Sequence, residues 1–256
     1  MAAPRGLLGL NDPDPKEMTI VEHLGELRRR SIICISVITV GSIAGWFFIS
    51  PVFHLLVTPL LPYSASATQP DGVQIMLGKL TDAFAIKVKI ALASGIALSL
   101  PVLLYQTWMF VVPAIAARAR RYAIPFVLVG IILFACGAIA GYLAFPLVVR
   151  FLLGQGHNLD NTRFLLQLGD YVGQFALMLL VFGVVFEMPV VLTFLAQIGA
   201  LSSRFLRAKR RYAAMLALIA AMVVTPGADP LTPFITAAMI YLLFELSIIM
   251  VRLLHR

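Results

Sequence analysis

The chain has 256 residues, of which 61% are hydrophobic and only 12% are charged, and its formal net charge is +8. Soluble domains carry about 25% charged and about 45–50% apolar residues, so this composition excludes a soluble globular protein and predicts an all-α integral membrane protein. Both cysteines, Cys34 and Cys136, lie in apolar runs without a metal or redox motif, which predicts simple packing roles for them.

The N-terminal segment is expected to be a flexible tail followed by a helix. Residues 1–17 contain three prolines and no sustained apolar core, so they do not resemble a cleavable signal peptide. Thr19 and Glu22 form a capping box, which predicts a helix start. Further along this helix, Glu26 can pair with Arg30 for about 0.3–0.5 kcal/mol, or it can hold a carboxylate at the membrane surface for a basic ligand. Both alternatives are open from the residues alone.

Six apolar runs predict six membrane-spanning helices, since about 20 apolar residues cross the hydrocarbon core. The fifth run has at most 17 uncharged residues, so the fifth helix and its hairpin partner, the sixth, are expected to be short and to thin the bilayer locally. We expect one membrane domain over residues 18–252 and a tail at 253–256, with spans at residues 31–49, 90–114, 123–149, 171–198, 212–228 and 231–251.

The connections between the runs alternate in charge. Fifteen of the 20 basic residues fall in residues 1–30, 116–122, 199–212 and 252–256. The positive-inside rule therefore predicts that both termini are cytoplasmic, in agreement with an even number of spans. The opposite side carries two sizeable loops, and the first is rich in proline and is expected to hold short interfacial helices.

Glu187 lies in the centre of the fourth run, with sixteen uncharged residues on each side. A charge at the bilayer centre costs at least roughly 2.5–3.5 kcal/mol, so such residues usually face protein and are functional. Glu187 could form a hydrogen bond to Gln197 or Thr193 and fix helix packing, or it could form a polar patch that docks a partner's helix or adapts to cargo. Pro189 is expected to interrupt the span nearby.

Enzyme signatures are missing from the sequence. It contains no H-E-x-x-H motif, no G-x-S-x-G motif and no phosphate loop, so we expect neither enzymatic activity nor a cofactor or metal, and no nucleic-acid partner. A secondary transporter of a small solute is the alternative function, and it predicts inverted repeats and broken helices at mid-membrane. An intramembrane enzyme would need a nucleophile or metal cluster at membrane depth. Neither pattern is visible in the sequence.

Six segments occur in an order that is characteristic of one family. They are His23–Arg30, Val57–Leu60, Pro101–Pro113, Phe182–Pro189, Thr225–Pro230 and Tyr241–Glu245. Together they resemble the TatC family, the receptor subunit of the twin-arginine protein translocase, over about residues 18–252. One such motif would be a weak signal, whereas six in register are specific.

The resemblance implies a concave, glove-like bundle of six helices in the bacterial inner membrane. It implies a receptor that binds signal peptides with two adjacent arginines and takes part in exporting folded proteins, with the proton-motive force as energy source. The implied partners are these signal peptides, TatA- and TatB-type single-span subunits and the lipid bilayer, and a homo-oligomer within the complex is possible.

The resemblance also implies roles for individual residues. Glu26 would contact the arginine pair, since a carboxylate binds a guanidinium through two parallel hydrogen bonds. The signal-peptide-binding site would further include His23, Arg28, Phe110 and Arg121. The positions expected to be structural or to dock partners are Pro59, Pro101, Glu187 and Asp229.

One position departs from the family pattern. The loop at residues 116–121 reads Ala-Ala-Arg-Ala-Arg-Arg, and Ala119 stands where the family usually carries a second glutamate. Two ligand arginines would therefore meet one carboxylate, from Glu26, and three nearby cations. We expect weaker twin-arginine binding for this reason, with Glu22 as a candidate to compensate.

Overall fold

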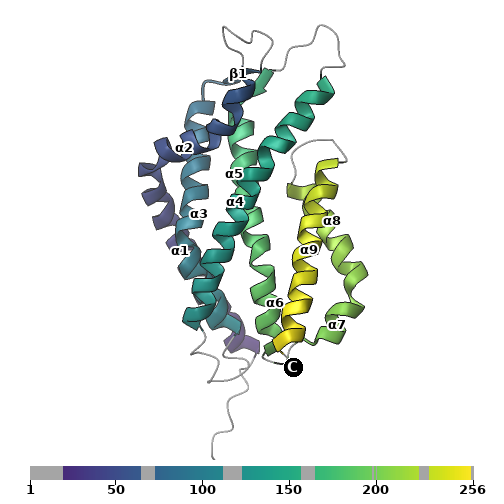
Figure 1. Cartoon of the computed structure of the whole chain (residues 1–256). Coiled ribbons are helices and arrows are strands. Elements are labelled where there is room, and N and C mark those ends of the chain that lie inside the picture. Colours follow the sequence, from purple (N-terminus) through teal and green to yellow (C-terminus); the bar gives the residue numbers. More distant parts are fainter. Residues whose placement is uncertain are drawn as a thin grey trace, which may run out of the picture.

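The computed structural model describes residues 20–64, 73–111, 123–156, 165–197, 199, 201–224 and 231–254. It confirms the predicted all-α membrane architecture, with long helices aligned along one axis (Figure 1). The elements are α1 (Ile20–Phe47), α2 (Ile49–Val57), η1 (Thr58–Tyr63), β1 (Gln74–Met76), α3 (Asp82–Val111), α4 (Ala123–Gly156), β2 (Leu165–Gln167), α5 (Leu168–Phe186), α6 (Met188–Gln197), α7 (Ser203–Ala208), α8 (Arg210–Val224) and α9 (Leu231–Leu254).

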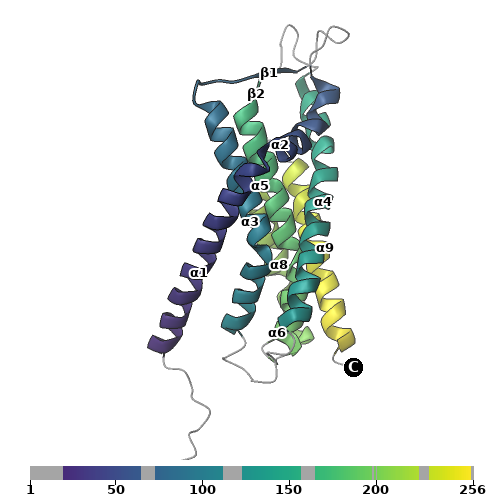
Figure 2. The same ribbon diagram turned by 90° about the vertical axis from the view of Figure 1, so that its left-hand side faces the viewer.

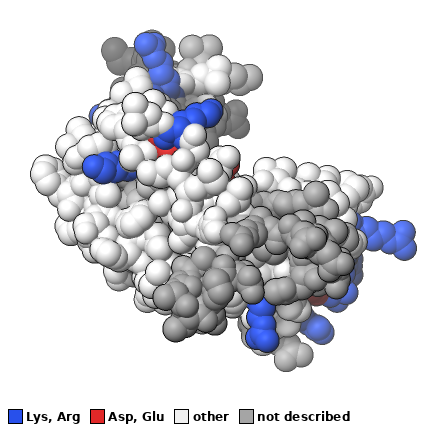
Figure 3. Space-filling model, turned by 90° about the horizontal axis from the view of Figure 1, so that it is seen from above, with Lys and Arg blue, Asp and Glu red and all other residues white. Residues whose placement is uncertain are grey.

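We call the end of the bundle where α1 begins and α9 ends the lower end, and the end that carries β1 and β2 the upper end (Figure 1). Seen from the upper end, most of the described surface is uncharged, and the charged side chains lie in two separate groups (Figure 3). Large apolar side chains are exposed along the long helices, including Ile43 of α1, Leu147 of α4 and Leu242 of α9, which suits a lipid environment.

Five helical stretches among the described residues are long and apolar enough to cross a membrane. They are His23–Phe47, Asp82–Phe110, Ile124–Gly154, Leu168–Gln197 and Pro233–Leu253. The fifth expected span corresponds to α8, which has 15 residues and is short as expected. A helix of that length rises about 22 Å, less than the roughly 30 Å hydrocarbon core, so α8 alone does not settle the count. The sixth expected span, α9, has 24 residues, so the expectation that it is short as well is wrong.

The helices extend beyond the apolar runs that predict them. The first begins at Ile20, as the capping box indicates, and continues without a break to Phe47. At the upper end, α3 begins at Asp82 and includes Lys87 and Lys89, while α4 continues to Gly156. Long basic side chains can reach polar surroundings from within a membrane helix, so charges mark where the hydrocarbon ends rather than where the helix ends.

The fourth apolar run forms two helices, α5 and α6, that meet at Glu187. The Glu187 N–H donates to the Val184 carbonyl at 3.1 Å, three residues back instead of four. Two residues later, Pro189 has no N–H to donate to the ladder. The interruption expected at this proline is therefore confirmed, and it places Glu187 at the joint.

The upper segment α2–η1 is anchored in the bundle by buried side chains and one long-range hydrogen bond. Leu56 and Leu60 are almost fully buried, and the Tyr171 hydroxyl of α5 donates to the Leu56 carbonyl at 3.0 Å. Figure 2 shows α2 crossing in front of the long helices near the upper end. The short helices expected in the first loop are confirmed. The parallel pairing of β1 with β2, which ties the two upper loops together, was not expected.

Close packing of α1 on α3 depends on small residues. A Cβ atom at Gly45 would lie 2.8 Å from the Ala91 carbonyl oxygen, and one at Gly95 would collide with the Ser42 backbone and hydroxyl. The Ser99 hydroxyl also donates to the Val37 carbonyl across this contact at 3.0 Å. Small residues let membrane helices approach closely, and here they hold the upper halves of α1 and α3 together.

We predict that Gly95→Ala destabilises the protein, although alanine is the better helix former. The new methyl group would force α1 away from α3, at an expected cost of about 1–3 kcal/mol. Gly154→Ala is the matched control, because nothing lies within 4 Å of a Cβ atom at that position on α4. The control should be neutral or stabilising by up to about 1 kcal/mol. Chemical unfolding in detergent measures both, and equal effects would contradict the prediction.

Candidate functional site

The lower ends of α1 and α3 bring together a carboxylate, a guanidinium and an amide. Glu26 Oε1 accepts from Arg30 Nε at 3.0 Å and also from Arg30 Nη2, so the pair expected within the helix is present. Arg30 Nη1 donates to Gln106 Oε1 of α3 at 2.9 Å. Arg30 therefore connects Glu26 to the neighbouring helix.

The second carboxylate oxygen of Glu26, Oε2, does not take part in the contact with Arg30. Glu26 Oε2 is buried and has no hydrogen-bond partner among the described residues. An unsatisfied buried acceptor costs about 1–3 kcal/mol, and more when it is charged. Glu26 is therefore suited to accept hydrogen bonds from a further donor.

An aromatic contact borders the carboxylate. The His23 ring of α1 stacks on the Phe110 ring of α3 with centroids 4.5 Å apart and planes 24° apart. His23 lies three residues before Glu26, on the same face of α1. The packing of two helices thus joins three residues expected in the binding site, although they are far apart in the sequence.

Gln106 belongs to this cluster, and the sequence reasoning missed it. It lies four residues before Phe110, so both share one face of α3, and that spacing could have identified it. Arg28 is exposed and lies about 200° around α1 from Glu26. The structure therefore does not bring Arg28 against the carboxylate. Ala119, Arg121 and Asp229 lie outside the described residues.

Glu187 is enclosed at the joint of α5 and α6. Its side chain is only 6% exposed, and neither carboxylate oxygen has a hydrogen-bond partner in the described part of the chain. A Cβ atom at Gly130 of α4 would lie 2.9 Å from Oε2, so the absence of a side chain there makes room for the carboxylate. The hydrogen bond considered to Thr193 or Gln197 is wrong, because neither Glu187 oxygen has a partner among the described residues, and Thr193 Oγ1 is also buried without one.

An aromatic cluster includes Phe194 of α6, two turns after Glu187. The Trp108 ring lies 3.8 Å from the Phe194 ring and 4.4 Å from the Phe126 ring, centroid to centroid. Trp108 Nε1 is a further buried donor without a partner within the described ranges. Unpaired polar atoms in an apolar core are costly, so these groups do not stabilise the region through hydrogen bonds among the described residues.

Of the two expected structural prolines, Pro59 is buried within η1, and Pro101 lies on an exposed part of α3. The burial of Pro59 is consistent with a packing role for that residue. Pro101 has no such role visible in the structure.

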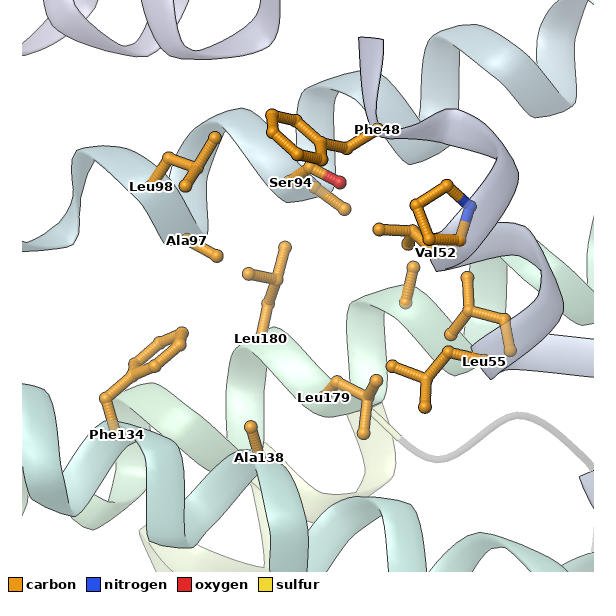
Figure 4. Close-up of a pocket in the computed structure, with 14 residues that line it drawn as sticks. Phe48, Val52, Leu55, Ser94, Ala97, Leu98, Phe134, Ala138, Leu179 and Leu180 are labelled. Atoms are coloured by element: carbon orange, nitrogen blue, oxygen red, sulfur yellow. The ribbon is translucent and has the colours of Figure 1, made fainter. Parts of the chain in front are cut away.

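A cavity of about 570 Å³ lies beneath α2, between α3, α4 and α5. Figure 4 shows side chains from these helices directed into it, and the Ser94 hydroxyl is the polar group among them. Ser94 Oγ is buried without a partner among the described residues. The apolar lining consists mainly of Phe48, Val52, Leu55, Leu98, Phe134, Leu179 and Leu180. Such a cavity can accept an apolar segment, and no metal-binding cluster of three or more His, Cys, Asp or Glu occurs among the described residues.

Comparison with known proteins gives consistent results. The family model described as Sec-independent protein translocase protein (TatC) matches residues 22–238. The Sec-independent protein translocase protein TatC of Desulforapulum autotrophicum is 34% identical over 237 residues, covering 92% of this chain and 85% of that protein. The TatC protein of Aquifex aeolicus is 34% identical over 240 residues, covering 93% of this chain and 97% of that protein.

The fold agrees with a solved structure as well. A crystal structure of the twin arginine translocase receptor TatC superposes with a TM-score of 0.80 at 34% sequence identity, and the match covers 92% of this chain and 100% of that one. A second crystal structure of that receptor, in the detergent DDM, gives a TM-score of 0.78 over 89% of this chain.

Proposed function

This chain belongs to the TatC family of Sec-independent protein translocase proteins, and on that premise we propose that it is the membrane receptor for twin-arginine signal peptides. It is a multi-pass membrane protein with a role in protein transport. The named relatives are translocase proteins, which favours this function over the small-solute transporter considered as the alternative. The observation that carries the proposal is the unpaired oxygen of Glu26.

The geometry around Glu26 supports recognition of a guanidinium. Glu26 Oε2 can accept one N–H of a ligand arginine while Oε1 is shared with Arg30. If Arg30 turns fully toward Gln106, both oxygens become available for two parallel hydrogen bonds. Lysine cannot form that fork, so discrimination between arginine and lysine follows from geometry rather than charge.

The second arginine and the apolar region of the signal peptide also have candidate contacts. The second guanidinium can lie flat beside the stacked rings of His23 and Phe110, where cation–π attraction contributes about 0.5–1 kcal/mol at exposed sites. The apolar region of a signal peptide is about 7–15 residues long. The cavity beneath α2 can take apolar side chains from that region.

We place both termini in the cytoplasm of a bacterium and the protein in its inner membrane. In support, basic side chains occur at the lower ends of several helices, including Arg28, Arg29, Arg30, Arg204, Arg207, Arg210, Arg211 and Arg252. The positive-inside rule assigns such an end to the cytoplasm. In this topology α8 is the fifth span and α9 the sixth, and the lipid beside α8 is thinned because α8 is short.

TatA- and TatB-type single-span subunits are the proposed protein partners, and the proton-motive force is the proposed energy source. The outer face of α8 supports docking of an apolar helix, because large apolar side chains recur on it at helical spacing and are exposed. They are Tyr212, Met215, Leu216, Ile219, Met222 and Val223. A short span with this face can pair with one helix of a partner inside the membrane.

Peptide titration tests the receptor function directly. The purified protein in detergent is titrated with a labelled signal peptide that carries Arg-Arg and with a control that carries Lys-Lys. A receptor of this kind should prefer the first by about tenfold or more, since a hydrogen bond to a charged group contributes about 1.5–3 kcal/mol. Equal affinity for the two peptides would overturn the proposal.

We further predict that Ala119→Glu tightens binding of the Arg-Arg peptide. The substitution restores the acid that the family usually carries at this position, so each ligand arginine would have a carboxylate. The affinity should rise by about tenfold, with little change for an uncharged peptide. Ala119→Gln, of nearly the same size but neutral, is the control. A gain with glutamine equal to that with glutamate would show that charge is not responsible.

A further inference from the structure

A second groove, of about 370 Å³, runs between α3 and α5. The residues that line it are polar at one end and apolar at the other. Lys89, Asp170 and Gln174 line it toward the upper end, and Leu92, Ile96 and Leu177 line it further down. We propose that this groove binds a phospholipid whose headgroup carries a primary amine, taken from the leaflet at the upper end. The polar end of this groove lies apart from Glu26, which is at the lower end, while its apolar part shares Leu180 with the cavity beneath α2.

Lys89 is held in place at the polar end of the groove. Its ammonium donates to the Gly169 carbonyl at 2.9 Å, in the first turn of α5. Its side chain lies along Gly173, where a Cβ atom would come within 3.0 Å of Nζ. An ammonium has three protons, so two remain for other acceptors. A phosphate oxygen is a suitable acceptor at the boundary of the bilayer.

Asp170 supplies the opposite charge beside it. Asp170 and Gln174 lie one turn apart on α5, both exposed and both in the wall of the groove. No cation forms an ion pair with Asp170 in the part of the chain that the structure describes. The groove therefore offers a cation, an acid and an amide within one short region, which is complementary to a zwitterion.

The length of the groove fits one leaflet. Ten residues separate Asp170 from Leu180, which also lines the groove, and ten helical residues rise about 15 Å. Half of the roughly 30 Å hydrocarbon core has the same thickness. A headgroup bound at Lys89 and Asp170 would thus leave an acyl chain lying along the apolar part of the groove.

The chemistry selects among phospholipids. In phosphatidylethanolamine the phosphate can accept from Lys89, and the primary ammonium can donate to Asp170. Phosphatidylcholine has a quaternary ammonium without N–H groups, so it cannot donate to the carboxylate. Phosphatidylglycerol has no cation and would leave the Asp170 charge unpaired. We therefore expect phosphatidylethanolamine to bind most tightly.

Native mass spectrometry of the purified full chain tests this assignment. The protein is titrated with phosphatidylethanolamine, phosphatidylcholine and phosphatidylglycerol that carry identical acyl chains. Lys89→Gln should weaken phosphatidylethanolamine binding about tenfold, and Lys89→Arg should retain it. Asp170→Asn should weaken phosphatidylethanolamine but not phosphatidylglycerol. Lys79→Gln is the matched control, because Lys79 is exposed near the same end and lies outside the groove.

Each other outcome overturns the proposal. Lipid binding that is unchanged in Lys89→Gln, or lowered equally in Lys79→Gln, would remove the lysine from the site. Equal loss of phosphatidylethanolamine and phosphatidylglycerol in Asp170→Asn would remove the headgroup selectivity. A changed oligomeric state without changed lipid binding would show that a second copy of the chain occupies the groove. Asp170 is exposed, so the Asp170→Asn result stays informative if a Lys89 variant folds poorly.

Discussion

Replacing Glu26 by alanine should abolish the preference for an Arg-Arg peptide over a Lys-Lys peptide. The substitution removes both acceptor oxygens, including the buried Oε2 that has no partner among the described residues. The loss should amount to about ten- to hundredfold in affinity for the Arg-Arg peptide, since hydrogen bonds to charged groups contribute about 1.5–3 kcal/mol. Fluorescence titration with the two peptides measures this change.

A second variant separates recognition from a structural role. Arg30 competes with the ligand for Glu26, so Arg30→Gln should tighten Arg-Arg peptide binding if the carboxylate is the receptor group. If Glu26 only holds Arg30 for its contact with Gln106, both variants should loosen the α1–α3 contact and weaken binding alike. Arg29→Gln serves as the charge control, because Arg29 is exposed and should not affect the peptide preference. Parallel losses in Glu26→Ala and Arg30→Gln would contradict the receptor role.

Replacing Glu187 by leucine should stabilise the protein and at the same time impair transport. The carboxylate is 6% exposed and has no hydrogen-bond partner among the described residues, so an apolar side chain of similar size removes an unsatisfied group. The expected gain is about 1–3 kcal/mol in the free energy of unfolding. Transport should fall, because a costly polar group that does not support the fold is retained for function.

Glu245 provides the matched contrast within the same bundle. Its Oε2 accepts from Arg210 Nη2 of α8 at 2.6 Å, and its Oε1 accepts from the Tyr241 hydroxyl at 2.9 Å. Glu245→Leu should therefore destabilise the protein, by about 1 kcal/mol given the exposure of the ion pair. Chemical unfolding in detergent and export of a folded reporter in cells measure the two effects. Destabilisation by Glu187→Leu similar to that of Glu245→Leu would indicate that Glu187 is a structural residue.

The hydropathy of the sequence could predict the long helices because each helix depends only on residues near to one another in the chain. In lipid, a helix satisfies its own backbone groups within one segment, so an apolar run of sufficient length specifies its own structure. The same locality explains why the Glu26–Arg30 pair and the interruption near Pro189 could be predicted, since each involves residues within one turn. The short α8 marks the limit of this reasoning, because its length alone does not decide whether it spans.

The sequence by itself determined the membrane class, the position of the long helices and the candidate acid at the lower end, since these depend on neighbours along the chain. Only the tertiary structure decided what those residues contact. It joined Arg30 to Gln106 across 76 positions, stacked His23 on Phe110, and paired β1 with β2. It also enclosed Glu187 without a partner in the described residues and placed Lys89 beside α5. Apolar helices pack in many ways with similar burial, so the choice among those packings depends on the shape of all the helices at once.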